Sequence, residues 1–133
     1  MSSESPAKGG RSSDEAGALA AALRVGQKAR DLTASDDEAS YLANEERQFA
    51  IERLLIRFGE ALKDVSPETL TKIDPHANWS GPKGFRNLAS HWYDDGLDHG
   101  LIWSALQGDL PTMLHAIKAW LSRPGEPSQD EAS

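Results

Sequence analysis

The residues best suited to chemistry lie together in one short run, 86–93, which reads Arg-Asn-Leu-Ala-Ser-His-Trp-Tyr. At about 100° per residue, a helix over this run places Arg86, Ser90 and Tyr93 on one stripe. Asn87 and His91 form a second stripe, and Arg86 and His91 diverge by about 140° around the ideal helix. On an isolated helix, therefore, the guanidinium and the imidazole point in different directions and would not both contact one small ligand.

Two copies of this helix that meet across a twofold axis would present each stripe again from the other side. Such a composite site suits metal-free RNA cleavage. A neutral imidazole at His91 would remove the proton from a ribose 2′-hydroxyl. The guanidinium of Arg86 would stabilise the negative charge on the phosphate that the 2′ oxygen attacks. Arginine fits this role because its planar fork binds two phosphate oxygens at once. We therefore expect a homodimer that takes RNA as substrate and needs neither a metal ion nor an organic cofactor.

The other polar candidates are weaker. The Gly81-Pro82-Lys83-Gly84 run has the wrong spacing for a nucleotide phosphate loop and contains a proline. Asp95 and His99 are four residues apart, but two ligands with no third in view favour a helix-surface pair over a metal site. His76 and His115 stand alone and are assigned no chemistry.

Several aromatic and basic side chains are assigned to packing or to solvent. We expect Trp92, Trp103 and Trp120 to contact the core or a dimer partner rather than to stack on bases. Arg53 and Arg57 lie four residues apart on one helix face, which favours a solvated or interface face over an active-site pair.

Helices must position these candidates, because the apolar residues recur at helical spacing. A first helix would begin with a cap at Asp14 and run to about Leu32. A second would cover about 37–64, with its apolar stripe at Ile51, Leu54, Leu55, Phe58 and Leu62. Ser66 would cap a short helix to about Lys72, whose first position is a proline.

The second half of the chain continues the helical pattern. A loop over 74–84, anchored by Trp79, precedes a third main helix over about 83–93. The final apolar series is interrupted near Gly108, where Asp109 would cap a last helix with Pro111 in its first turn. No segment alternates with a period of two, so a sheet has no evident source. We therefore predict an all-α antiparallel bundle of about four or five helices.

Length, composition and charge bound the molecule as a whole. The chain has 133 residues, no Cys and a formal net charge of −7, from 14 Lys and Arg against 21 Asp and Glu. We expect one domain over 14–122, between disordered tails at 1–13 and 123–133. Lack of Cys excludes a disulfide framework, and the acidic excess argues against a broad nonspecific nucleic-acid surface. With no apolar stretch long enough to cross a bilayer and no evident secretory signal, we expect a cytoplasmic protein without membrane contact.

The run 86–93 resembles the hallmark of the HepT-like ribonuclease toxins of the HEPN superfamily. That hallmark is an Arg, usually followed by a polar residue such as Asn, then four to six residues on a His, then one further residue and a Tyr. Arg86-Asn87, His91 and Tyr93 match it, with four residues between Arg86 and His91. The similarity extends over about 14–121 and includes these landmarks: 58–62, Trp79, 84–87, Ile102-Trp103 and Asp109-Leu110-Pro111.

The resemblance implies an all-α, homodimeric endoribonuclease in which Arg86 and His91 from both protomers line a cleft, with Asn87 and Tyr93 in support. It also implies a toxin that is neutralised by an MntA-like nucleotidyltransferase antitoxin, which transfers AMP from ATP to Tyr93. Bulky anionic groups placed one helical stripe from Arg86 would block a phosphate site. The acidic Asp94-Asp95 pair after the motif should disfavour RNA, so we expect narrow rather than broad activity.

Two alternatives stay open at the level of the residues. His91 could be a hydrogen-bonded interface histidine with Arg86 as its salt-bridging neighbour, and Tyr93 could plug the end of the bundle. From a different functional class, the protein could be a non-catalytic helical binding module that docks a nucleotidyltransferase and serves as its acceptor substrate. RNA cleavage without metal, and arrest of growth on expression alone, would separate the enzyme from this module.

Overall fold

The computed structural model describes residues 4–82, 84–85 and 97–123. In these ranges helices are joined by short connections, and no strand occurs. The bounded helices are α1 (Glu4–Leu32), α2 (Glu38–Leu42), α3 (Glu45–Lys63), α4 (Pro67–Ile73), α6 (His99–Gln107) and α7 (Asp109–Leu121). The predicted all-α class is confirmed. No helix in the described part of the chain combines the length and the apolar character needed to span a membrane.

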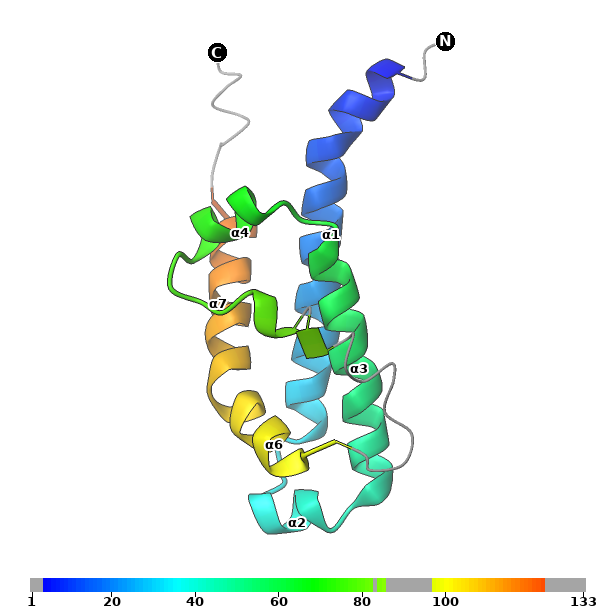
Figure 1. Cartoon of the computed structure of the whole chain (residues 1–133), viewed down its shortest axis with the longest axis vertical. Coiled ribbons are helices and arrows are strands. Elements are labelled where there is room, and N and C mark those ends of the chain that lie inside the picture. Colours follow the sequence, from blue (N-terminus) through cyan, green and yellow to red (C-terminus); the bar gives the residue numbers. More distant parts are fainter. Residues whose placement is uncertain (1–3, 83, 86–96, 124–133) are drawn as a thin grey trace.

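The long helices α1, α3 and α7 form the bundle, and short helices lie at its ends (Figure 1). α1 packs against α3 and α7, and both run antiparallel to it. α2 follows the end of α1, contacts α3 and α6, and turns the chain back into α3. α4 lies at the opposite end, against α7. Short connections between antiparallel neighbours are typical of helix bundles, in agreement with the predicted architecture.

The first helix begins earlier than its predicted cap. α1 starts at Glu4 rather than at Asp14, so part of the segment predicted as a tail continues the helix. Pro6 lies in the first turn, where its missing amide hydrogen would have no helical partner. These first turns extend beyond the other helices (Figure 1). The domain boundary at 14 stays a prediction, and of the predicted C-terminal tail only Arg123 lies within the described residues.

One predicted helix is two helices in the structure. The prediction of a continuous helix over 37–64 is wrong, because α2 ends at Leu42 and α3 begins at Glu45. The Asn44 side chain accepts a hydrogen bond from the Arg47 amide at 2.9 Å. A side-chain oxygen that bonds an amide in the first turn caps a helix and sets its start. The break thus follows from a capping residue inside an otherwise helical pattern.

The sequence predicted caps at the starts of α4 and α7. The first prediction is correct, and the second is off by one residue. Ser66 caps α4 as predicted, and its hydroxyl accepts the Thr69 amide at 3.2 Å. Asp109 is the first residue of α7, and the cap position belongs to Gly108, which has no side chain to cap with. The predicted cap at Asp109 is therefore wrong. The chain bends one residue earlier, where the Gly108 amide donates to the Ser104 carbonyl at 3.0 Å and ends α6.

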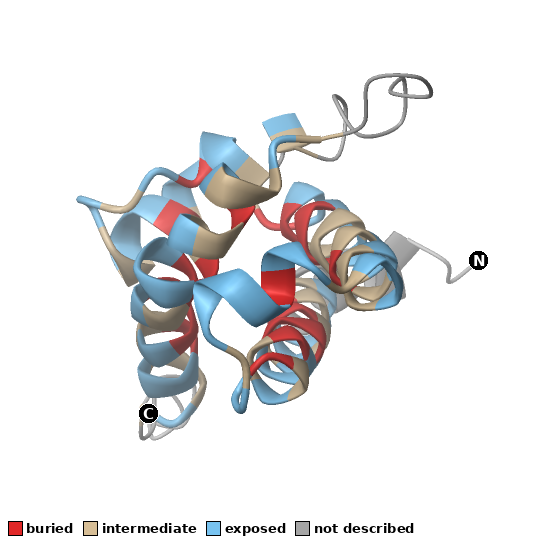
Figure 2. Cartoon of the chain, turned by 90° about the horizontal axis from the view of Figure 1, so that it is seen from below, coloured by how far each residue is buried: buried red, intermediate tan, exposed pale blue. Residues whose placement is uncertain are grey.

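The core lies where the apolar faces of the helices meet, with exposed positions on the outer faces (Figure 2). The predicted apolar stripe of α3 lies in this core or packs against it: Ile51, Phe58 and Leu62 are buried, and Leu54 and Leu55 are partly buried. Arg53 and Arg57 are exposed, as predicted for a solvated or interface face. The helical periodicity therefore assigned the buried face of α3 correctly.

Arginine side chains satisfy two helix C-termini at the α2 end of the bundle. The last carbonyls of a helix have no partner within the helix. Arg47 of α3 donates to the Leu32 carbonyl at the end of α1 and, at 2.7 Å, to the Asp36 carboxylate. Arg30 of α1 donates to the Leu106 carbonyl of α6 at 2.9 Å. These bonds tie the ends of α1 and α6 to neighbouring helices.

Gly26 of α1 allows α3 and α7 to approach closely. A Cβ there would lie 2.6 Å from Leu114 Cδ2 and 3.3 Å from Phe58 Cδ1, whereas a Cβ at Gly17 would meet nothing within 4 Å. We expect Gly26→Val to lower the free energy of unfolding by about 1–3 kcal/mol, because a packed core resists added volume. Gly17→Val, the matched control, should change it by less than about 0.5 kcal/mol. Urea denaturation measures both, and equal effects would contradict close packing at Gly26.

The carboxyl group of Asp37, which caps α2, should titrate in acid. The Asp37 carboxylate accepts the Ser40 amide at 2.8 Å, and the Asp37 amide donates to Ser40 Oγ at 3.0 Å. The Ser40 amide, followed by the Ser40 hydroxyl, lowers the pKa of Asp37 below its usual 3.8. The stabilisation by this cap is therefore complete above pH 3.8 and is lost as the pH falls through the lower folded pKa.

We expect the NMR shift of the Ser40 amide to follow this titration in the wild type. In Asp37→Asn the same signal should stay flat, because asparagine caps a helix without an ionisable group. A wild-type signal that is equally flat through the acid range would show that the Asp37 cap does not titrate.

Candidate functional site

The structure describes both flanks of the predicted catalytic run but not the run itself. The four predicted site residues lie outside the described residues: Arg86, Asn87, His91 and Tyr93. Their roles therefore stay predictions, and so does the AMP acceptor role of Tyr93. The described chain stops at Phe85 before the run and resumes at Leu97 after it.

The flank before the run is an anchored turn that leads into a helix. Trp79 is buried, and its Nε1 donates to the Asp74 carbonyl at 2.9 Å, as predicted for a loop anchored by its tryptophan. The backbone is helical at 80–82 and 84–85, so this helix starts before the predicted Lys83, which lies outside the described residues. Pro82 is tolerated because the amides of a first helical turn have no helical partner.

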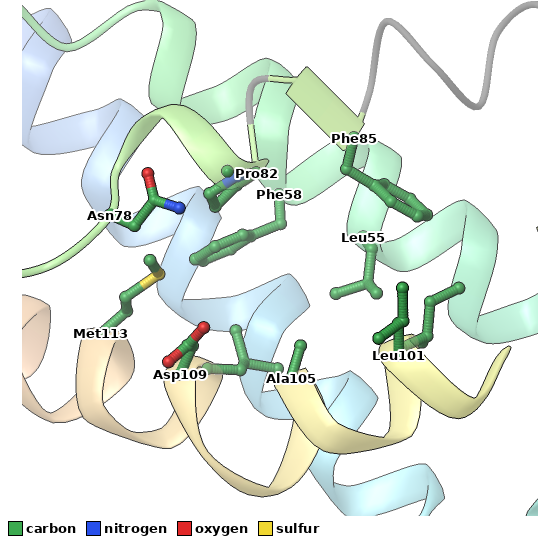
Figure 3. A pocket seen from close by; sticks show the side chains of 12 residues that line it. Leu55, Phe58, Asn78, Pro82, Phe85, Leu101, Ala105, Asp109 and Met113 are labelled. Atoms are coloured by element: carbon green, nitrogen blue, oxygen red, sulfur yellow. The ribbon is translucent and has the colours of Figure 1, made fainter. Parts of the chain in front are cut away.

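A pocket of about 470 Å³ opens beside this flank, between α3, α6 and α7 (Figure 3). Phe85, the neighbour of Arg86 in sequence, forms part of its wall together with Leu101, which is 69% exposed. Asn78 and Asp109 contribute polar side chains to a wall that is otherwise mainly apolar. The remaining lining residues are Leu55, Phe58, Gly81, Pro82, Ile102, Ala105, Leu110 and Met113. Such a wall offers shape and apolar contact rather than proton transfer.

The flank after the run begins with a polar relay formed by Tyr41, His99 and Glu52. The Tyr41 hydroxyl lies 2.7 Å from His99 Nδ1, and His99 Nε2 lies 2.6 Å from Glu52 Oε2. The relay joins three helices, since Tyr41 belongs to α2, Glu52 to α3 and His99 to the first turn of α6. The predicted surface pair of Asp95 with His99 is wrong for His99, whose side chain is only 10% exposed and is bonded to Tyr41 and Glu52. Asp95 lies outside the described residues.

The relay has the order of a nucleophile, a base and an orienting carboxylate, but not the exposure that catalysis needs. Tyr41 is 0% exposed, so its hydroxyl cannot meet a substrate. Burial, followed by the charges of Glu52 and Asp36, raises the pKa of Tyr41 well above its usual 10. Tyr41 therefore keeps its proton near neutral pH and serves as a hydrogen-bond donor.

Sequence reasoning missed the relay because its members are far apart along the chain. Tyr41 and Glu52 precede His99 by 58 and 47 residues. The only local signal was Asp98, whose side chain accepts the Gly100 amide at 3.0 Å and so caps α6. This cap places His99 at the first helical position, but nothing local indicates which helices it meets.

The other candidates lie apart from the relay or pack against the bundle. His76 and His115 are exposed. Trp103 is half-buried, with its ring centroid 5.4 Å from that of Tyr41, and Trp120 is half-buried, with the Arg123 guanidinium 3.4 Å from its ring centroid. These two tryptophans thus make contacts within the chain, and Trp92 lies outside the described residues. No group of three or more His, Asp or Glu that could hold a metal ion occurs in the described ranges.

Trp79 should stabilise the flank before the run. Trp79→Phe removes the hydrogen bond to the Asp74 carbonyl and part of a buried side chain, so we expect the free energy of unfolding to fall by about 1–3 kcal/mol. The same change at the half-buried Trp120 is the control and should cost less. Urea denaturation compares the two variants, and equal losses would contradict a specific anchoring role for Trp79.

Comparison with known proteins assigns the chain to a family. A family model described as ribonuclease HepT-like matches residues 23–120. This range includes the C-terminal part of α1, all of α2, α3, α4 and α6, nearly all of α7, and the whole run 86–93. No curated protein and no solved structure matches the chain significantly. Because the family model covers well over half of the chain, the protein belongs to the HepT-like ribonuclease family.

Proposed function

We propose that this protein is a metal-independent endoribonuclease that acts as the toxin of a toxin–antitoxin pair. The observation that carries the proposal is that the HepT-like match over 23–120 contains Arg86, His91 and Tyr93 with the spacing of the motif. The packed flanks give additional support, because Trp79 and His99 fix the chain on either side of the run.

In the proposed reaction His91 is the general base and Arg86 binds the phosphate. The neutral imidazole takes the proton of the ribose 2′-hydroxyl, and the 2′ oxygen attacks the adjacent phosphorus while the bond to the 5′ oxygen breaks. The products are a 2′,3′-cyclic phosphate and a 5′-hydroxyl, whose proton comes from an imidazolium or from water. The guanidinium neutralises charge that builds up on the phosphate oxygens, and Asn87 orients the substrate or His91.

A homodimer would complete this site. Arg86 and His91 diverge by about 140° on one ideal helix, so a single helix presents them in different directions. A second copy related by a twofold axis supplies the missing stripe from the opposite side. The proposed active site is therefore a cleft shared by two protomers.

The proposed antitoxin is an MntA-like nucleotidyltransferase that acts in the cytoplasm. It transfers AMP from ATP to Tyr93: the tyrosine hydroxyl loses its proton and attacks the α-phosphorus of ATP, and pyrophosphate leaves. Each AMP group adds negative charge one helical stripe from Arg86 and blocks access of the RNA phosphate. The acidic Asp94-Asp95 pair and the net charge of −7 already repel RNA, so the proposed activity is directed at few RNAs.

Cleavage of RNA in EDTA tests the proposed catalytic pair. We expect the wild type to cut, and His91→Ala and Arg86→Ala to lose about 10²–10⁴-fold in rate, the range typical of a general base or an electrostatic group. His115→Ala and Arg24→Ala are matched controls, because both residues are exposed and lie outside the motif. The controls should cut within about twofold of the wild type, since surface substitutions away from a site have small effects.

Equal cutting by the wild type and both motif variants would contradict the proposed mechanism. The rival function, a non-catalytic module that docks a nucleotidyltransferase, is distinguished by growth. Expression without the partner arrests cells under the proposed function and is harmless under the rival. Mass spectrometry of the wild type and of Tyr93→Phe, each coexpressed with the nucleotidyltransferase, detects AMP transfer under either function.

A further inference from the structure

We infer that Tyr41, His99 and Glu52 are positioning residues, which set the start of α6 and thereby the far end of the run proposed for catalysis. The inference goes beyond the motif, because none of the three belongs to it. It rests on two short hydrogen bonds that join α2, α3 and α6 at one point. Its kinetic test rests on the proposed ribonuclease function.

The hydrogen-bonding capacity of the relay permits one arrangement of protons around a neutral His99. Glu52 as a carboxylate can only accept, so Nε2 carries the hydrogen and donates to it. Nδ1 then has a free lone pair, which accepts the Tyr41 hydroxyl. The Tyr41 hydroxyl and both ring nitrogens of His99 thus have partners, and the tautomer and ring plane of His99 are set by helices other than its own. This is the way in which outer partners orient a histidine in many functional sites.

Because Tyr41 is buried and the His99 side chain is nearly so, their hydrogen bond favours one position of α6 over others. Tyr41 is 0% exposed, and the side chain of His99 is 10% exposed. A buried donor left without its acceptor loses its bond to water as well, so a shift of α6 that separates these groups is penalised. The Tyr41 ring also lies against Trp103 of α6, with ring centroids 5.4 Å apart. α6 is thus held in register with α2 by a polar bond and by an aromatic contact.

The position of His99 in the chain connects the relay to the proposed chemistry. His99 is the first residue of α6 and follows His91 by eight residues. At the other end, Trp79 is hydrogen-bonded to Asp74 and precedes Arg86 by seven residues. The proposed catalytic pair therefore lies between two fixed points. Misplacement of a catalytic group by about 1 Å can reduce the rate about 10²-fold, so release of one fixed point should slow catalysis.

Kinetics of RNA cleavage test the inference. Tyr41→Phe removes only the hydroxyl, and we expect kcat to fall about tenfold or more while KM changes less than about twofold. Glu52→Ala should behave in the same way. Glu52→Gln should restore most of the loss, because an amide oxygen can accept the hydrogen of His99 Nε2. Glu46→Ala, at an exposed position of the same helix, is the matched control and should retain wild-type kcat.

The assay temperature is chosen so that circular dichroism shows every variant to be fully folded. A purely structural role would then lower the melting temperature and leave kcat unchanged. Unchanged kcat in Tyr41→Phe, or a Glu52→Gln variant as slow as Glu52→Ala, would overturn the positioning role.

Hydrogen exchange separates this inference from the proposed function. If the wild type cuts no RNA, the ribonuclease proposal fails, and exchange alone decides the role of the relay. We expect Tyr41→Phe to speed exchange of the Ile102 amide, which donates to the Asp98 carbonyl at 3.1 Å, by about tenfold. The Leu70 amide of α4, bonded to the Ser66 carbonyl at 3.0 Å, should be unaffected. No change at Ile102, or an equal change at both amides, would overturn the inference.

Discussion

The apolar stripe of α1 is the surface on which α3 and α7 pack, and the rest of the bundle depends on that contact. Several of its buried positions are small: Ala22, Gly26 and Ala29. Small side chains bring helix axes close together, so the larger side chains of the facing helices can fill the space between them. Phe58 of α3 and Leu114 of α7 both lie next to Gly26. A chain of this size can therefore bury a continuous core without a disulfide.

Polar contacts at the α2 end of the bundle give this core a defined arrangement. Arg47 and Arg30 satisfy carbonyls at the ends of α1 and α6, and the relay joins α6 to α2 and α3. Apolar packing alone is nondirectional, whereas each of these bonds is met in only one register of the helices. The short helices α2 and α6 are thus held at defined positions by a few directional bonds, although neither is long enough to be stable in isolation.

The proposed function has to agree both with membership of the HepT-like ribonuclease family and with the acidic net charge of the chain. The acidic balance of the chain makes general RNA binding unfavourable, so affinity has to come from a local cationic site. In the proposal Arg86 of each protomer supplies that site, and its role in binding the phosphate explains why AMP on Tyr93 would inactivate the enzyme. The pocket lined by Phe85 and Leu101 adds apolar surface next to the last described residue before the run, and part of its wall belongs to α6.

Local patterns in the sequence determined the helical class, the buried face of α3, the cap at Ser66 and the motif at 86–93, because each depends on residues within a few positions of one another. The break at Asn44 was equally local, but a strong apolar periodicity on both sides concealed it. Tertiary structure alone decided that Glu15 of α1 would accept the Ser66 amide of α4, and that His99 would meet Tyr41 and Glu52. The physical reason is that such bonds form between groups on different helices. Which groups meet is set by how the whole bundle packs, and no short stretch of sequence carries that information.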